Sequence, residues 1–596
     1  MERQEKLKAL RKLMTDQGLD CYIIPASDPH QNEYIPACWQ FRSWLSGFTG
    51  SAGTIVITAD VAGLWTDSRY FIQAEKQLEG SGIELFKLKI PHTPEHIPWL
   101  ASTLPANSKV GIDDRFFSIG MVQYIQDVLN GAGHQLSTGI DLLSPVWIDQ
   151  PPIPANPVLI HDIKFAGLSR REKIWKVVEE MKELKADYHL ITTLDDIAWL
   201  LNLRGSDISF CPFFISFCIV TSNHTHLFIN QDKIPASVSN ALSEDQILIH
   251  PYGAISQFLE KLPKGSTILF SPEKVNHALI QTIPSDVKQK HGMNITSGLK
   301  AIKNPAEIGG LKRVMVKDGI AWVETLHWID QQVHSGITES EWSVALKIAE
   351  YRSAQPEYQG ESFHPISSYE WHGAVVHYSV TQEESLNLRP EGIFLLDSGG
   401  HYSDGTTDTT RTIALSTPDG QQKSDFTRAL KGTLGVSMLR FPKGTKGFQM
   451  DILARKSLWD IGLNYSHGTG HGVGFFGSVH EGPQTIGTSA SGYLNIGLEP
   501  GMVTTVEPAI YREGNYGMRT ENMTLVVEDL ENEYGTFYRF ETLTLAPIDR
   551  RLIDKNLLTP AELDWLNAYH LRVYAELADY LTTEEQIWLK EATKPL

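Results

Sequence analysis

Three aspartates crowd a short stretch rich in glycine and threonine in the second half of the chain. Asp397, Asp404 and Asp408 lie within "LLDSGGHYSDGTTDTTRTIAL" (395–415), directly behind an apolar run. A carboxylate beside a buried strand is costly unless a positive group compensates it. Asp404 precedes a glycine, which is a turn signal. We therefore expect a hairpin that brings Asp397 and Asp408 together for chemistry and leaves Asp404 at its tip in a structural role.

Two histidines lie four residues apart in the glycine-rich stretch "SHGTGHGVG" (466–474). The spacing of His467 and His471 is that of a helical metal pair, but the surrounding glycines disfavour a stable helix. We therefore expect a turn or a strand to present both side chains. Taken alone, a loop histidine is more often simply exposed or capping.

Two glutamates occupy strand-like segments further along the chain. Glu507 ends the run "MVTTVE" and precedes a proline, where the strand should stop. In "MRTENMTLVV" (518–527), strand alternation places Arg519 and Glu521 on the same face as Met523, which should point into the core. A buried ion pair would by itself explain that glutamate and that arginine.

These segments together predict four inward carboxylates and several histidines on separate strands. Four buried carboxylates would repel one another and take up protons unless cations neutralise them. Two divalent ions about 3.5–4 Å apart, bridged by carboxylates, would do so. Ligands that are mostly oxygen with one imidazole favour hard ions, Mn²⁺ first, with Co²⁺, Fe²⁺ or Zn²⁺ as alternatives.

The rest of the chain indicates how these segments are held. Its 596 residues predict several domains. A proline-rich segment (144–160) predicts a linker, and a capping box that opens at Asn304 marks a second boundary near residue 300. Capping signatures at Thr559 and Thr582 predict a helical tail.

The two segments before residue 300 look like diverged copies of each other. Each opens with an amphipathic helix and continues into a strand, "DCYIIP" (20–25) or "DYHLIT" (187–192). Further on, "WLSGFTGS" (44–51) aligns with "WLLNLRGS" (199–206) at the same spacing. This pattern predicts two α/β domains of one fold, with chance similarity of two helix–strand units as the alternative.

Composition and charge exclude several classes of partner. The chain has 52 basic and 71 acidic residues, a net charge of −19, which argues against nucleic acid or an anionic membrane. Its 4 cysteines are too few for a disulfide scaffold. The charged first helix is unlike a secretion signal, and the most apolar stretch (212–220) is too short to span a membrane. These features predict a cytoplasmic protein.

At the motifs described above, the chain resembles the aminopeptidase P (Xaa-Pro aminopeptidase) family, whose members are metallopeptidases with the pita-bread fold. The resemblance is to the long, three-domain form and covers essentially the whole chain. In that family the ligands of a dinuclear metal centre are Asp, Asp, His, Glu and Glu in chain order. By motif, they fall on Asp397 in "LLDSGG", Asp408 in "DGTTDTTR", His471 in "GTGHGVG", Glu507 in "TVEPAIY" and Glu521 in "MRTENM".

The same resemblance implies four further site residues. They are His377 in "AVVHY", His467 in "SHGTGHG", His480 in "VHEGP" and Arg519 near the last ligand. The chain departs from the family pattern at Ala509, where many relatives have glycine, and this bears on the shape of the local loop.

The fold class that the resemblance implies is mixed α/β. Two creatinase-like α/β domains (1–155 and 156–300) would precede a pita-bread catalytic domain (301–540), and a helical C-terminal extension (541–596) would pack on that domain. The resemblance also implies a homodimer.

The activity that it implies is hydrolysis of the Xaa-Pro bond, which releases the first residue of peptides whose second residue is proline. A hydroxide that bridges the two ions would attack the scissile carbonyl. Glu507 would take part in proton transfer, His467 and His480 would donate to the carbonyl or oxyanion, and His377 would position the residue after the bond.

Two alternatives stay open. The first is a prolidase, which cleaves Xaa-Pro dipeptides with the same five ligands. The second is a non-catalytic peptide-binding protein, or a metal-free hydrolase of the creatinase type, on the same fold; both would be expected to have lost ligands. Methionine aminopeptidases share the fold but lack the duplicated N-terminal region.

Overall fold

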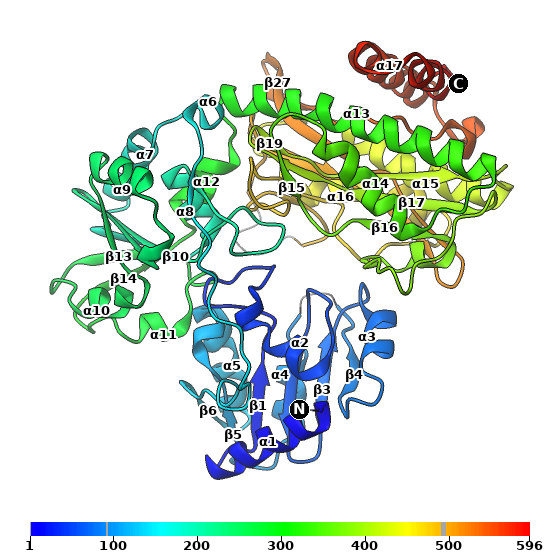
Figure 1. Cartoon of the computed structure of the whole chain (residues 1–596). Helices are drawn as coiled ribbons and strands as arrows, with labels where there is room; N and C mark the ends of the chain where they lie inside the picture. Colours follow the sequence, from blue (N-terminus) through cyan, green and yellow to red (C-terminus); the bar gives the residue numbers. More distant parts are fainter. Residues whose placement is uncertain (1, 91–92, 490–495) are drawn as a thin grey trace. The chain divides into compact units, whose positions relative to one another are not determined.

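The computed structural model describes residues 2–90, 93–489 and 496–596. The chain divides into two compact units (Figure 1). The first unit comprises Met1–His161 and Leu168–Thr296, and the second comprises Asp162–Gly167 and Ser297–Leu596.

The first unit contains two six-stranded mixed sheets with equivalent strand orders, β4-β3-β2-β1-β5-β6 and β12-β11-β10-β8-β13-β14. In each sheet a central strand, β1 or β8, pairs antiparallel with one neighbour and parallel with the other. The predicted duplication is therefore confirmed, because the two copies share the whole order and direction of their strands. The strands are Cys21–Ile24 (β1), Thr54–Thr58 (β2), Ala62–Thr66 (β3), Glu84–Lys87 (β4), Lys109–Gly111 (β5), Gln135–Ser137 (β6), Tyr188–Ile191 (β8), Ser216–Thr221 (β10), Thr225–Ile229 (β11), Ile247–Pro251 (β12), Thr267–Phe270 (β13) and Lys288–His291 (β14).

The aligned tryptophan-containing segments end a helix in the same way in both copies. Helix α2 (Phe41–Ser46) is capped by Gly47 at φ 76°, and α8 (Leu194–Leu201) is capped by Asn202 at φ 47°. Glycine and asparagine adopt this left-handed conformation more readily than other residues. The aligned glycine and asparagine thus serve one purpose, which is to turn the chain out of the helix.

Helices cover the sheets of the first unit. The predicted first helix, α1, buries Leu7, Leu10 and Met14, and its counterpart α7 buries Val177 and Met181. The helices are Arg3–Asp16 (α1), Phe71–Gln77 (α3), His96–Thr103 (α4), Ile119–Gly131 (α5), Arg170–Glu183 (α7), Ala236–Glu244 (α9), Ile255–Glu260 (α10) and His277–Ile280 (α11), and α12 (Ile295–Ala301) contains the boundary with the second unit.

The second unit is built from antiparallel strands covered by helices. Two of its sheets have the orders β16-β17-β20 and β21-β28-β27-β24, and a third has the order β15-β18-β19. The strands of the first two are Ile366–Tyr369 (β16), Ile393–Ser398 (β17), Thr409–Ala414 (β20), Arg440–Pro442 (β21), Val503–Val506 (β24), Asn522–Asn532 (β27) and Gly535–Thr542 (β28). Further strands complete it: Tyr358–Glu361 (β15), Gly400–Tyr402 (β18), Gly405–Thr406 (β19), Gly470–His471 (β22), Thr485–Ile486 (β23), Ala509–Arg512 (β25) and Tyr516–Arg519 (β26).

Long helices pack against these strands (Figure 1). They are Pro305–Ser335 (α13), Glu341–Ser353 (α14), Gly420–Ser437 (α15) and Gly447–Trp459 (α16), with the short α6 (Ile163–Ala166) beside α13. The C-terminal helices α17 (Pro560–Leu577) and α18 (Thr583–Ala592) lie against α13. Their apolar residues join those of α13 and the strands in one core.

The predicted helix starts of the second unit are confirmed. The side chain of Asn304 caps α13 by accepting hydrogen bonds from two backbone N–H groups. The carboxylate of Glu307 in turn accepts a hydrogen bond from the backbone N–H of Asn304 at 2.9 Å. Thr559 and Thr582 open the same capping box at α17 and α18. These boxes satisfy backbone donors that every helix leaves unpaired at its first turn.

Two general features bear on the sequence-based expectations. Across the described residues, every helix is either too short or too polar to traverse a bilayer. The four cysteines are buried free thiols.

Candidate metal centre

The first two candidate carboxylates lie in or directly beside paired strands: Asp397 is within β17, and Asp408 comes one residue before β20 rather than within it. Asp397 lies on β17 directly opposite Thr410 of β20. Asp408 stands two residues before Thr410, so strand alternation directs its side chain to the same face. The short hairpin β18–β19 makes the return between them and carries Asp404 at its turn.

Asp404 has a different environment. Its carboxylate is buried and forms ion pairs with Lys317 at 2.9 Å and with Arg313 at 3.3 Å, both on α13. Its charge is therefore compensated by the long helix, which ties the hairpin turn to α13. This arrangement fits the structural role expected from the Asp-Gly signal.

Glycines allow His471 to reach the site from a strand rather than from a helix. A side chain at Gly470 would meet the carbonyl oxygen of Thr505 at 2.0 Å, and one at Gly472 would meet that of Glu481 at the same distance. These glycines let β22 lie directly against its neighbours. The backbone N–H of His471 then donates to the Thr505 hydroxyl at 3.1 Å.

The two glutamates lie at the ends of strands in the sheet that contains β24 and β27. Glu507 comes directly after β24, where Pro508 ends the strand, and Glu521 lies between β26 and β27. The hydroxyl of Thr410 donates to the carboxylate of Glu521 at 2.7 Å. The sheet of β17 and β20 is thereby joined to the sheet of β24 and β27 at the site.

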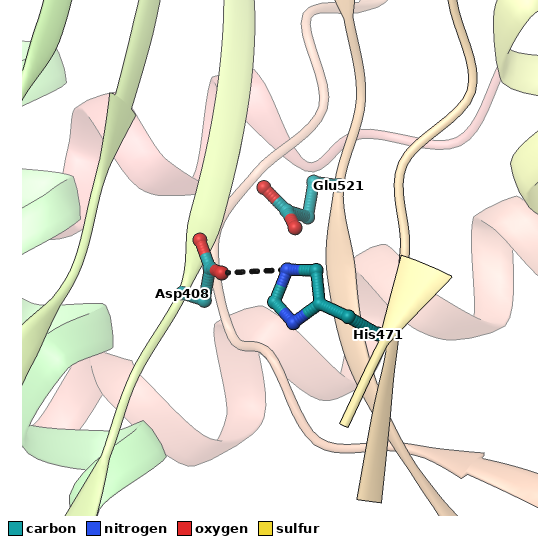
Figure 2. Close-up of side chains that lie close together, drawn as sticks. All are labelled: Asp408, His471 and Glu521. Atoms are coloured by element: carbon teal, nitrogen blue, oxygen red, sulfur yellow. Dashed lines mark ion pairs between the residues drawn. The ribbon is translucent and has the colours of Figure 1, made fainter. Parts of the chain in front are cut away.

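Asp408, His471 and Glu521 converge on one point from separate segments (Figure 2). One ligand atom from each lies within 4.8 Å of the others. The Nδ1 of His471 contacts the carbonyl oxygen of Gly472 at 3.0 Å, which favours a proton on that nitrogen. Nε2 is then directed at Asp408 (3.4 Å) and Glu507 (3.6 Å). A backbone carbonyl that orients an imidazole in this way is typical of metal-binding histidines.

Burial, together with the crowding of acids, raises the pKa values of Asp397, Glu507 and Glu521. Burial raises the pKa of Glu521 well above its ordinary value, and the charges of Asp408 and Glu507 raise it further. Burial also raises the pKa of Asp397 to about 7, although the Arg519 guanidinium opposes that shift. Burial disfavours the charged form of His471, yet its contacts with Asp408 and Glu507 raise its pKa to about 9. Without further cations, this site therefore binds protons.

The residues present fit divalent ions. Four carboxylates gather around the imidazole of His471 beside the guanidinium of Arg519, and Oδ1 of Asp397 is buried without a hydrogen-bond partner. A buried carboxylate oxygen without a partner is unfavourable unless a ligand completes its environment. Oxygen-rich donor sets with one imidazole suit Mn²⁺ and related ions.

Arg519 and Tyr511 form a supporting layer behind the carboxylates. Arg519 donates to Oδ2 of Asp397 at 2.5 Å and to the Tyr511 hydroxyl at 2.7 Å. That hydroxyl lies 2.9 Å from Nε2 of His467, and burial raises the pKa of Tyr511 to about 12. Tyr511 was not among the sequence-based candidates. Its place could have been inferred from the β25–β26 hairpin, because Ala509 pairs with Arg519 and alternation puts Tyr511 on the same face.

The three predicted substrate-side histidines lie in different positions around the cluster. His467 places Nδ1 3.8 Å from Glu507 and 2.7 Å from the carbonyl oxygen of Gly468. The ring of His480 stands edge-on to that of His471, with 4.4 Å between centroids. His377 is half-buried in the loop after the 3₁₀ helix Glu370–Ala374, which packs against β26. Ala509, the departure from the family pattern, is buried within β25.

A pita-bread domain that gathers carboxylates and an imidazole from several strands defines the class of dinuclear metallohydrolases. Comparison with family models agrees. Residues 310–528 match metallopeptidase family M24, and residues 536–596 match the C-terminal region of that peptidase family. Residues 6–140 and 149–307 each match a creatinase/prolidase N-terminal domain.

Whole-length relatives specify the family further. Aminopeptidase P2 of Arabidopsis thaliana is 38% identical over 99% of this chain and 88% of its own length. A probable Xaa-Pro aminopeptidase P of Coprinopsis cinerea is 38% identical over 100% of this chain and 99% of its own length. The crystal structure of an X-prolyl aminopeptidase from Caenorhabditis elegans, described as a cytosolic enzyme with a di-nuclear active site, superposes with a TM-score of 0.95 at 34% identity and covers 100% of both chains.

The chain belongs to the aminopeptidase P family of M24 metallopeptidases. The predicted resemblance and the predicted fold, two creatinase-like α/β domains before a pita-bread domain with a C-terminal region, are thus confirmed.

Proposed function

We propose that this protein is a metal-dependent aminopeptidase that hydrolyses the Xaa-Pro bond and releases the first residue of peptides with proline in second place. The observation that carries the proposal is the convergence of Asp408, His471 and Glu521, with Glu507 beside them, in a chain of this family. A full-length relative named probable Xaa-Pro aminopeptidase P and the full-length structure of an X-prolyl aminopeptidase support the substrate class.

Five residues are proposed as ligands of two divalent ions: Asp397, Asp408, His471, Glu507 and Glu521. We expect Mn²⁺ to be the preferred ion, with Co²⁺, Fe²⁺ or Zn²⁺ as alternatives, because most of the donors are carboxylate oxygens. Such a pair of ions would supply an activated water near neutral pH and neutralise the charge that develops during hydrolysis.

The protein's own groups would handle the protons. Burial raises the pKa of Glu507, which favours a carboxyl that can take up a proton and pass it on. The nitrogen of an Xaa-Pro bond carries no N–H, so the site need not offer it an acceptor, but the leaving nitrogen must gain a proton. Glu507 is proposed to relay that proton.

The surrounding side chains would orient the substrate. His480 and His467 flank the cluster, and each could donate to the scissile carbonyl or to the oxyanion. Tyr511 and Gly468 already engage both ring nitrogens of His467, so its donation would require a rearrangement of that network. His377 is proposed to position the residue after the scissile bond, and Arg519 to hold Asp397.

A panel of peptides tests this function. The protein is stripped of metal, restored with Mn²⁺ and offered Xaa-Pro-Yaa, Xaa-Ala-Yaa and Xaa-Pro peptides. Release of the first residue from Xaa-Pro-Yaa alone supports the proposal. Cleavage confined to the Xaa-Pro dipeptide would instead identify a prolidase, and binding of Xaa-Pro-Yaa without cleavage would identify a non-catalytic binding protein.

We also propose a cytoplasmic homodimer. The buried free thiols and the cytosolic C. elegans relative support the location. Exposed apolar side chains on and after α16, namely Ile452 (54% exposed), Trp459 (47%) and Ile461 (40%), support a self-contact. Light scattering should show that Trp459→Glu yields monomers, whereas Trp175→Glu, at another exposed tryptophan, leaves dimers. Monomers in the unmodified protein would contradict the dimer.

A further inference from the structure

Strand β20 has two faces with different tasks. Thr410 of β20 faces the metal cluster, to which Asp408, directly before the strand, also belongs, and Thr410 donates to the carboxylate of Glu521 at 2.7 Å. Arg411, the next residue, therefore points to the opposite side. It is 1% exposed and lies under the C-terminal region of the chain.

On one side, the guanidinium of Arg411 holds the backbone around a proposed ligand. Nη1 donates to the carbonyl oxygen of Glu521 at 2.6 Å and to that of Thr410 at 2.8 Å. Nη2 donates to the side-chain oxygen of Asn522 at 2.8 Å. Arg411 thus sets the position of the main chain at Glu521, while Thr410 sets the position of its carboxylate.

On the other side, the same guanidinium reaches the C-terminal extension. Nη2 donates to the hydroxyl of Tyr569 at 2.8 Å and to the carbonyl oxygen of Ala546 at 2.9 Å. Tyr569 lies on α17, and its hydroxyl in turn donates to Ala546 at 2.8 Å. The ring of Tyr569 stacks on that of Trp565, one turn earlier on the helix, with 5.4 Å between centroids and 7° between planes.

The chemistry of this contact makes it sensitive to small changes. The hydrogen bonds of Arg411 go to carbonyl oxygens, an amide oxygen and a phenol, so this buried charge depends on well-placed neutral acceptors. Removing the Tyr569 hydroxyl would take away one acceptor and let the guanidinium shift toward the remaining ones. A shift of Arg411 would move the carbonyl of Glu521 with it.

We propose that Tyr569 is a positioning residue for the metal centre: it acts through Arg411 to hold Glu521, so that the C-terminal extension tunes the affinity and geometry of the site. Groups that orient metal ligands from behind commonly change metal affinity by about 10–100-fold when they are removed. Tyr569 contacts Arg411 rather than Glu521 itself, so we expect its removal to change metal affinity by less than this. This inference rests on the proposed metal centre.

The test is a titration of the metal-free, full-length protein with Co²⁺, followed by visible absorption and by calorimetry. Tyr569→Phe should weaken binding of at least one ion by roughly 3–10-fold and alter the absorption spectrum. Arg411→Lys, which keeps the charge but loses the planar fork, should weaken it more. Tyr574→Phe is the matched control, because Tyr574 lies on the same helix and packs against the same core.

Melting of each metal-free variant separates positioning from general stability. A metal-free Tyr569→Phe protein that melts like the parent but binds Co²⁺ more weakly supports the proposal. If Tyr569→Phe binds Co²⁺ like the parent and like Tyr574→Phe, the inference is overturned while the metal centre stands, even if the variant melts earlier. A parent protein that takes up no Co²⁺ would overturn the metal centre and this inference with it.

Discussion

At the residue scale, the environment of Asp397 illustrates how the site is balanced. One carboxylate oxygen is held by Arg519, and the other is buried without a partner. Asp404, only seven residues away, has its charge compensated by two cations on α13. The strand aspartate and the turn aspartate thus differ: cations of the protein compensate Asp404, whereas one oxygen of Asp397 has no partner in the protein.

This contrast predicts opposite outcomes for two isosteric substitutions. Asp408→Asn should abolish metal uptake and peptidase activity, because it removes a charged oxygen from the cluster. Asp404→Asn should retain metal but lose about 1–3 kcal/mol of stability, because it breaks charged hydrogen bonds to α13. Metal content by mass spectrometry and urea unfolding would measure both effects. Equal loss of metal from both variants would contradict the ligand assignment.

The raised pKa values predict how the metal-free protein responds to pH. Asp397 (pKa about 7) and His471 (about 9) bind a proton more tightly in the folded protein than in the unfolded chain, where their pKa values are about 3.9 and 6.5. Their stabilising contributions are therefore fully present below the unfolded values and are lost as the pH rises through about 7 and about 9.

The melting temperature of the metal-free protein should consequently fall between pH 5 and 8.5. Saturating Mn²⁺ should flatten that fall, because the ions replace the protons as compensating charge. Scanning calorimetry with and without Mn²⁺ measures both slopes. A metal-free protein whose melting temperature rises over this range would show that these groups are not protonated as the structure indicates.

Tyr511 carries a third prediction at this scale. Tyr511→Phe should lower kcat by about tenfold with metal content unchanged, because Arg519 and His467 lose the hydroxyl that orients both. Tyr516→Phe is a suitable control on the same hairpin, since its hydroxyl donates to Asp425 instead. Steady-state kinetics on an Xaa-Pro-Yaa peptide would compare them. An unchanged kcat in Tyr511→Phe would show that the Tyr511 hydroxyl has no role in catalysis.

At the scale of elements, close backbone packing presents His471. Gly470→Ala would drive a methyl group into the carbonyl of Thr505, whereas the nearest atom to a side chain at Gly468 is 3.5 Å away. Gly470→Ala should therefore displace β22 and weaken metal binding at least tenfold, in the range seen when support for a ligand is lost. Gly468→Ala should bind metal like the parent in the same calorimetric titration, and equal affinities in all three proteins would refute this role of the glycine.

The sequence allowed those elements to be predicted whose determinants are local. The capping boxes at Asn304, Thr559 and Thr582 specify helix starts within four residues, and the Asp-Gly turn specifies the hairpin of Asp404. Arg411 and Tyr569 are 158 residues apart in the sequence, so no local sequence pattern at either residue predicts their contact. Such contacts depend on how α17 docks, which only the folded chain determines.

At the scale of the whole molecule, the duplication in the first unit was foreseeable because a helix–strand unit recurs and "WLSGFTGS" (44–51) aligns with "WLLNLRGS" (199–206). The order of the strands follows only from the folded chain. The complete site was predicted less directly. Strand alternation and the adjacent apolar runs indicated that the acids point inward, but the set of five metal ligands followed from the family resemblance. The geometry now adds Tyr511 and Arg411, whose importance lies in long-range hydrogen bonds rather than in a motif.

We propose that two metal ions bind among five side chains: Asp397, Asp408, His471, Glu507 and Glu521. Anomalous diffraction from a crystal of the full-length protein soaked in Mn²⁺ would locate them. We expect two anomalous peaks about 3.5–4 Å apart, enclosed by these five side chains. A crystal whose manganese peaks lie elsewhere, or which shows none among these residues, would contradict it.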